Sequence, residues 1–269
     1  MDKKAMRALW LKTLEKHPEA NFLQSPEYGR VNEILGEKVV IEDFGGRGYA
    51  LMIVRNAKRG RYLEIPCGPL MDFSNLKERI KVFDRITEVA EREKCVFVRM
   101  RPQLLATPEN LEMLSEMGLK KSPMHLAAEH TVMINLEASE EALLVGMRRQ
   151  TRYEVRRADK LGSEVLSGNS EELFREFHEV QTETARRQNF VPPSLEVLLA
   201  EREAFRNKIK IRGADGRGGE DCVWADYPGR AGGGLLRGGL DGAKSEVAGG
   251  VCVALAGDAR FEGGGVCAV

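Results

Sequence analysis

The chain has 269 residues, of which 42% are hydrophobic and 30% charged, a composition typical of a soluble globular protein and not of a disordered or fibrous one. Lysine plus arginine and aspartate plus glutamate both number 41, so the protein has no overall field that attracts nucleic acid, and any anion site must be local. No apolar run approaches the ~20 residues of a membrane span, and the charged N-terminal segment predicts a cytoplasmic protein.

The first 136 residues alternate between helical and strand patterns. An amphipathic helix ends near Pro18, and a second helix ends at Gly36. Two strands joined by Gly-Gly-Arg-Gly predict a hairpin. The expected helices cover residues 5–14, 28–35, 75–93 and 108–117, and the expected strands cover residues 39–44, 49–57, 62–66, 95–100 and 130–136.

The helix expected at 75–93 and the strand expected at 95–100 should contribute to the core of a first domain. The strand is short and mostly apolar, which indicates a central position in a sheet. The side chains expected to point inward are Ile80, Phe83, Ile86, Val89, Ala90 and Val98. The alternation of helices, a hairpin and single strands predicts an α/β layer fold.

The stretch 148–160 is strongly basic and contains only two acids. Ser139, followed by two glutamates, is typical of a helix start, and Gly162 of a helix end, so a helix is expected between them. The cations expected near one face are Arg149, Arg152, Arg156 and Lys160. Such crowding costs stability through repulsion, so the pattern indicates either a solvated face or a face that binds an anion such as phosphate.

A strand around 164–166, helices at 171–187 and 194–205, and a strand at 208–211 follow. From Arg212 onward the chain is rich in glycine and keeps no helical or strand period, so it should bury a core poorly. Arg260-Phe-Glu-Gly-Gly-Gly265 fits the loop with which acetyltransferases hold coenzyme A. No patterned strand precedes this motif and no amphipathic helix follows it, so we interpret it as a chance match.

Five stretches carry a family resemblance by their order and spacing between residues 20 and 211. They are Phe22-Leu23-Gln24-Ser25, residues 62–72 with Gly68-Pro69, Phe97-Val98-Arg99 before Pro102, residues 130–136, and the basic run 151–160. Together they resemble the Fem-type aminoacyltransferases (FemA, FemB and FemX), which add amino acids to peptidoglycan precursors. The resemblance implies tandem acetyltransferase-like (GNAT) α/β domains, a first at 1–134 and a second, incomplete one at 135–211.

The resemblance also implies a function: transfer of an amino acid from aminoacyl-tRNA to the stem peptide of a UDP-linked or lipid-linked muramyl peptide. The phosphate contacts carry over to Arg152, Arg156 and Thr151 of the basic run. A family lysine near the start of the second helix corresponds to Asn32, with Arg30 two residues earlier as a substitute. No cofactor is implied, no general base is nominated, and the lysine that the family uses near its C-terminus has no counterpart.

Two other functions stay open at this point. One is a coenzyme-A-dependent N-acyltransferase of the same fold, since a fold does not fix a function. The other is a non-catalytic module that binds RNA or phosphate, although aromatic residues are not interleaved with the basic run. The cysteines and histidines show no CxxC spacing or cluster, so neither a metal site nor a disulfide framework is predicted.

The tail permits a second reading in another frame. With synonymous codons chosen freely for residues 235–260, a shift of one nucleotide gives Tyr-Tyr-Glu-Gly-Ala-Ser and later Leu-Pro-Gly-Ala-Tyr, which resembles the Fem-type sequence at this place. Glycine, alanine and arginine share GC-rich codons, which suits a misread GC-rich gene. The sequence therefore predicts that residues 212–269 are translated out of frame, are poorly ordered and leave the chain inactive.

Overall fold

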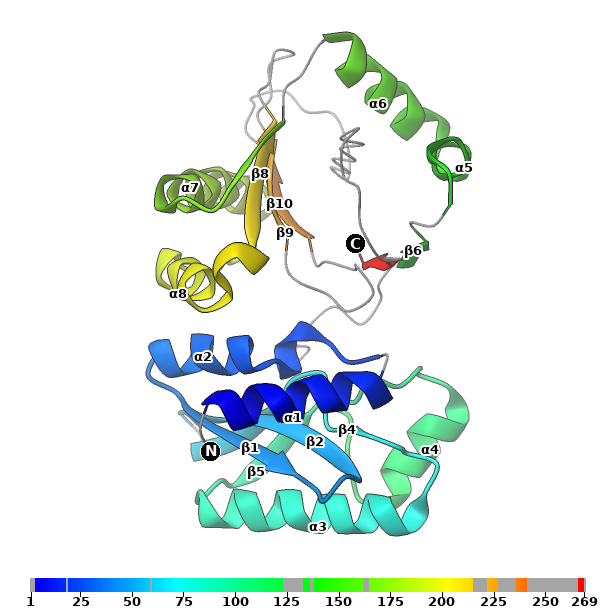
Figure 1. Cartoon of the computed structure of the whole chain (residues 1–269), viewed down its shortest axis with the longest axis vertical. Coiled ribbons are helices and arrows are strands. Elements are labelled where there is room, and N and C mark those ends of the chain that lie inside the picture. The colour runs from blue at the N-terminus through cyan, green and yellow to red at the C-terminus, as the bar shows by residue number, and fades with distance from the viewer. Residues whose placement is uncertain are drawn as a thin grey trace. The chain divides into compact units, whose positions relative to one another are not determined.

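The structure is a computed structural model (Figure 1). It describes residues 3–17, 19–58, 60–122, 133–135, 138–161, 165–214, 222–226, 236–240 and 266–268. The chain divides into two compact units, Met1–Thr131 and Val132–Val269. Both units combine helices and strands, which confirms a mixed α/β protein, while the tandem acetyltransferase arrangement stays a prediction.

The first unit is built on a five-stranded sheet whose path runs β1-β2-β3-β5, with β4 paired to β2. Its strands are β1 (Lys38–Asp43), β2 (Gly48–Ala57), β3 (Gly60–Ile65), β4 (Leu70–Met71) and β5 (Phe97–Met100). The predicted hairpin is confirmed, since β1 and β2 pair antiparallel from Lys38 opposite Val54 to Asp43 opposite Tyr49. The central position predicted for the strand near 95–100 is wrong, because β5 pairs only with β3 and ends the described path.

Helix α3 (Leu76–Arg92) covers one face of this sheet (Figure 1). Asn75 caps it by accepting hydrogen bonds from the backbone N–H groups of the first turn. Ile86, Val89 and Ala90 are buried against the sheet as predicted, and Phe83 and Val98 are half-buried at the margin of the same cluster. The prediction for Ile80 is wrong: it is 50% exposed, and Val82 is buried in its place.

The opposite face of β1 and β2 is covered by α1 (Lys3–Lys16) and α2 (Pro26–Ile34) (Figure 1). The Trp10 ring of α1 meets Tyr49 of β2 with 5.7 Å between ring centroids. A short 3-10 helix, η1 (Phe22–Gln24), joins the two helices, and α4 (Pro108–Glu116) follows β5. None of the helices in the described part of the chain combines the length and apolar composition that a membrane crossing requires.

The second unit contains a four-stranded antiparallel sheet of order β10-β9-β8-β7 and a short pair of β6 with β11. Helices α7 and α8 lie on one side of the larger sheet (Figure 1) and bury Phe174, Phe177, Leu198 and Phe205. The elements are β6 (Met133–Asn135), α5 (Glu140–Gly146), α6 (Arg149–Leu161), β7 (Val165–Gly168), α7 (Glu171–Gln188), α8 (Leu195–Phe205), η2 (Arg206–Lys208), β8 (Lys210–Ala214), β9 (Cys222–Asp226), β10 (Leu236–Leu240) and β11 (Val266–Ala268).

Two expectations for this unit need correction. The helix expected between Ser139 and Gly162 is two helices, α5 and α6, because Met147 takes an extended conformation between them. The expectation of no regular structure after residue 211 is wrong for the described tail segments, since β9 and β10 add two strands to the sheet. Both strands pair through backbone hydrogen bonds, and these bonds do not require the alternating side-chain pattern that the tail lacks.

Candidate functional site

Gln24 is fully buried and holds the part of β2 that has no strand neighbour on one side. Strand β2 pairs with β3 from Ile53 onward and with β4 at Tyr49, so Leu51 lies in the gap between the two. The Gln24 amide fills this gap: Oε1 accepts from Leu51 N–H at 2.8 Å, and Nε2 donates to Leu51 O at 3.2 Å. Nε2 also donates to the carbonyl of Pro66, which ties the end of β3 to the same side chain.

The turn from Pro66 to Pro69 is shaped to accept this amide. Cys67 has a positive φ of 50°, and the peptide bond between Gly68 and Pro69 is cis. A Cβ on Gly68 would lie 2.8 Å from the Gln24 amide, so only glycine fits. These contacts explain why the stretches around Gln24 and Gly68, which carried the family resemblance, occur together.

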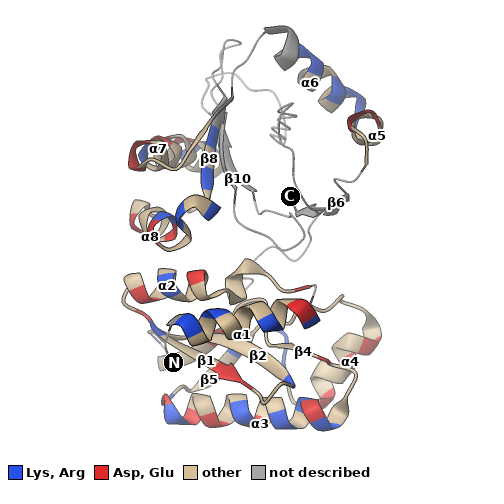
Figure 2. Cartoon of the chain, in the orientation of Figure 1, with Lys and Arg blue, Asp and Glu red and all other residues tan. Residues whose placement is uncertain are grey.

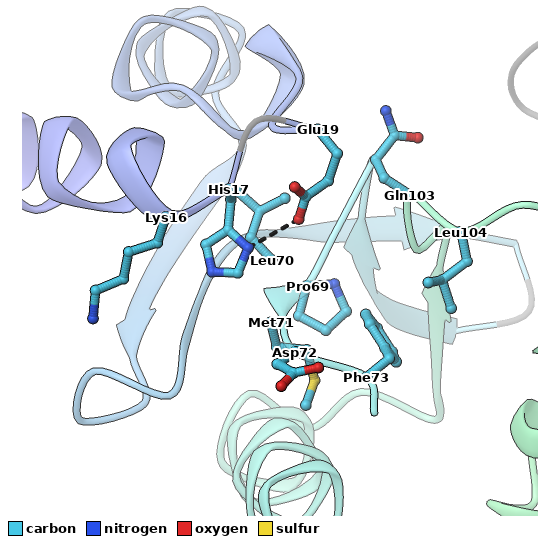
Figure 3. A pocket seen from close by; sticks show the side chains of 10 residues that line it. All are labelled: Lys16, His17, Glu19, Pro69, Leu70, Met71, Asp72, Phe73, Gln103 and Leu104. Atoms are coloured by element: carbon cyan, nitrogen blue, oxygen red, sulfur yellow. Dashed lines mark hydrogen bonds and ion pairs between the residues drawn. The ribbon is translucent and has the colours of Figure 1, made fainter. Parts of the chain in front are cut away.

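The turn directs the chain into a surface pocket of about 270 Å³ (Figure 3). The pocket lies where the end of α1, the start of β4 and the segment after β5 come together. Its lining residues are Lys16, His17, Glu19, Pro69, Leu70, Met71, Asp72, Phe73, Gln103 and Leu104. The sequence analysis did not nominate these residues, although the resembling stretch 62–72 ends at Asp72.

The pocket brings acidic and basic groups together. His17 Nδ1 lies 2.9 Å from Glu19 Oε1, and Figure 3 shows this contact beside Asp72. Asp72 Oδ1 accepts hydrogen bonds from the Ser74 hydroxyl at 2.7 Å and the Ser74 N–H at 2.9 Å. These bonds, and to a smaller degree the charge of His17, lower the pKa of Asp72, so its carboxylate is ionised at neutral pH. The pocket therefore presents one carboxylate, Asp72, that is held by Ser74, and a second, Glu19, that is paired with His17.

The second candidate surface is α6, along whose ribbon several arginine positions follow one another, coloured blue in Figure 2. Arg149 and Arg156 are exposed, and Thr151 and Arg152 are half-buried. Within the described residues, no carboxylate pairs with Arg149, Arg152 or Arg156. Among the described residues, the helix therefore presents guanidinium groups without a carboxylate partner, as the anion-binding interpretation requires.

Arg152 differs from its neighbours because it also stabilises the break between α5 and α6. Its Nη1 donates to Val145 O at 3.1 Å and to the carbonyl of Met147. These carbonyls belong to the end of α5, where a cation is favourable. Arg152 thus positions α6 relative to the end of α5. Lys160 lies in α6, but its side chain is outside the described residues.

The two predicted residues on α2 differ in what they offer. Arg30 is exposed, and its Nη1 lies 3.4 Å from Glu33 Oε2. Asn32 is only 2% exposed, and its Nδ2 donates to Tyr28 O at 2.8 Å within the helix. Its amide is used inside the fold, so a substrate contact from Asn32 has no support in its surroundings. Arg30 is the better candidate of the two.

Two other sequence-based interpretations concern cofactors. The Arg260 motif, which resembles a coenzyme A loop, lies outside the described residues. The described residues contain no group of three or more His, Cys, Asp or Glu side chains that could bind a metal ion.

Comparisons with known proteins point to one family. The model of the FemAB family matches residues 12–211. The solved structure of FemX is similar with a TM-score of 0.65 and 19% sequence identity, covering 80% of this chain and 56% of FemX. The structure of L-PGS from Bacillus licheniformis gives a TM-score of 0.49 at 14% identity, covering 91% of this chain and 69% of that protein. No curated protein matches the chain in sequence. The chain thus spans a little over half the length of FemX.

Proposed function

The chain belongs to the FemAB family, and on this basis we propose that it derives from an aminoacyltransferase that moves an amino acid from aminoacyl-tRNA to the stem peptide of a peptidoglycan precursor. The reaction joins an amine of the stem peptide to the ester carbonyl of the aminoacyl-tRNA. The new C–N bond replaces the C–O bond to the ribose, and the proton of the amine ends on the released ribose hydroxyl. The ester is already activated, so orientation and charge stabilisation are sufficient and no cofactor is required.

The observation that carries this proposal is α6, a helix of the matched region whose Arg149 and Arg156 are exposed and pair with no carboxylate among the described residues. A UDP-linked or lipid-linked precursor contains a pyrophosphate, whose oxygens accept the forked N–H pairs of arginine. Arg149 and Arg156 are the exposed donors, with Arg152 and Thr151 beside them. The helix is thus assigned to the phosphates of the acceptor substrate.

The pocket in the first unit is assigned to the acceptor's amine. Asp72 stays ionised and accepts hydrogen bonds, so it can hold an ammonium group of the stem peptide and orient it. Glu19 adds a second carboxylate, paired with His17. This assignment predicts that Asp72→Asn weakens binding of a precursor with a free amine and leaves an N-acetylated precursor unaffected, as measured by calorimetry.

Binding tests the proposal better than turnover does, because the tail leaves this chain without the family's late lysine. Arg156→Ala should weaken binding of UDP-muramyl pentapeptide by about 1–3 kcal/mol, the range for a charge-assisted contact. Arg152→Ala should weaken binding similarly but also loosen the junction of α5 and α6. The matched control is Arg175→Ala, which removes an exposed arginine of α7 that pairs with Glu171. Equal affinities of the Arg156 and Arg175 variants would remove α6 from the site.

A further inference from the structure

Strands β3 and β5 place two aromatic rings side by side on the sheet. Tyr62 and Phe97 are direct partners in the parallel ladder, although 35 positions separate them in the chain. Their rings stack with 4.9 Å between centroids and an angle of 6° between planes. Phe97 remains 41% exposed. The pair therefore presents flat aromatic surface to its surroundings.

Arg99 completes this arrangement. Its guanidinium carbon lies 5.5 Å from the centroid of the Tyr62 ring and 5.9 Å from that of Phe97, within the range of cation–π contacts. Within the described residues, no carboxylate pairs with Arg99. By contrast, Arg55 on the neighbouring strand is bound by Glu64 at 2.7 Å and Glu37 at 3.2 Å. Glu64 lies opposite Arg99 in the ladder, but its carboxylate is bonded to Arg55, so among the described residues Arg99 has no carboxylate within ion-pair distance.

The three residues, which we call the stacking platform, lie on the sheet face opposite α3. Leu63 of β3 is fully buried in the core beneath α3, so Tyr62, one position earlier, points to the other face. On that other face, α1 and α2 cover Leu51 and Ile53 of β2. Tyr62 and Phe97 belong to neither of the two hydrophobic clusters of the first unit, and Phe97 keeps the exposure given above.

We infer that the stacking platform, formed by Tyr62, Phe97 and Arg99, binds an unpaired base of RNA, with Arg99 contacting the adjacent phosphate. Proteins that bind single-stranded nucleic acid combine aromatic rings, on which bases stack, with arginine. An apolar protein partner fits less well, because a charged guanidinium lies over the rings and would be buried unpaired. The inference rests on the proposed function, since aminoacyl-tRNA is the RNA that the reaction requires.

The sequence counted one feature against RNA binding, namely that no aromatic residues are interleaved with the basic run. Aromatic residues are absent from the basic run, but base stacking does not need both features in one segment. Here Tyr62 and Phe97 come from separate strands, and only their register brings them together. The platform is distinct from α6, which lies in the other unit of the chain.

The test measures binding of the full chain to a single-stranded oligoribonucleotide that contains 2-aminopurine, and to unacylated tRNA. Phe97→Leu keeps an apolar side chain but removes the ring, and it should weaken oligonucleotide binding about tenfold and reduce the quenching of 2-aminopurine fluorescence. The slope of log K against log salt is negative, and Arg99→Gln should make it shallower by about 0.7, as expected for one lost phosphate contact on a single strand. The matched control is Phe190→Leu, since Phe190 is 42% exposed and lies outside the platform; it should leave both measurements unchanged.

The outcomes separate the platform from the proposed function. If the protein binds RNA but Phe97→Leu and Phe190→Leu bind equally well, the platform is wrong and the function stands. Binding of RNA at the platform without binding of either UDP-muramyl pentapeptide or its lipid-linked form would support the platform and remove the function. Binding of the precursor without any RNA would overturn the platform. A dimer in sedimentation that only Phe97→Leu dissociates would overturn it too, because the occupant would then be a second copy.

Discussion

Replacing Gln24 by methionine should destabilise the first unit strongly, although the two side chains are similar in size. Gln24 is 0% exposed; its Oε1 accepts a hydrogen bond from Leu51 N–H, and its Nε2 donates to Leu51 O and Pro66 O. Methionine has a similar shape but neither donates nor accepts strongly. The substitution therefore leaves these three groups unsatisfied in the interior.

The expected cost follows from these contacts. A buried polar group left without its partner costs about 1–3 kcal/mol, and the two carbonyls lie at the lower end of this range. Together the three groups give a loss of about 4 kcal/mol in the free energy of unfolding. The free energy of unfolding of a whole domain is only about 5–15 kcal/mol, so the variant should be near the limit of folding.

Urea unfolding, followed by tryptophan fluorescence, measures this loss. The chain has two tryptophans, so Trp224→Phe in every variant leaves Trp10, which is buried in the first unit, as the reporter. With a slope of about 2 kcal/mol/M, the midpoint should fall by about 2 M. The control is Gln103→Met, the same change at a half-exposed residue of the pocket, which should cost less than about 0.5 kcal/mol. Equal midpoints for both variants would refute the role given to Gln24.

Three further predictions follow from the same structure. Gly68→Ala should destabilise the first unit by about 1–3 kcal/mol in the same titration, because its Cβ would lie 2.8 Å from a buried amide. The hydrogen bond from Lys38 lowers the pKa of Glu93, so wild type should be more stable than Lys38→Met above the ordinary glutamate pKa of about 4.3. This difference in stability should disappear as the pH falls through the lower pKa that Glu93 has in the folded protein. A difference that does not depend on pH would contradict the role of this pair. Sequencing of the gene should place the change of frame near Arg212, whereas an intact frame together with turnover by this chain would exclude the shift.

Much of the first unit could be predicted from local patterns. The hairpin of β1 and β2 was recognised because its turn residues fix the register of adjacent strands. The helix start at Ser139 was recognised because a side chain there bonds to backbone within three residues. Membership of the FemAB family was also recognised from the sequence and is confirmed.

Other predictions failed where distant contacts decide. A single helix was expected from Ser139 to Gly162, but the Arg152 side chain turns back to the carbonyls of Val145 and Met147 and stabilises a break. The burial of Asn32 was not foreseen, since the residue was nominated only because it occupies the position of a family lysine. Neither the break between the helices nor the burial of Asn32 can be predicted from hydrophobic periodicity, because periodicity indicates which apolar side chains are buried and not which partners polar side chains find.

The sequence by itself determined the mixed α/β class, most helices and strands, and the cationic face of α6, because each depends on residues within a few positions of one another. The tertiary structure alone decided that Gln24 serves as the missing strand partner of Leu51, 27 positions away. It alone brought Tyr62 beside Phe97 and gathered the pocket around Asp72. The reason is that strand pairing and buried hydrogen bonds join groups far apart in the chain, and no periodicity specifies which distant partners meet.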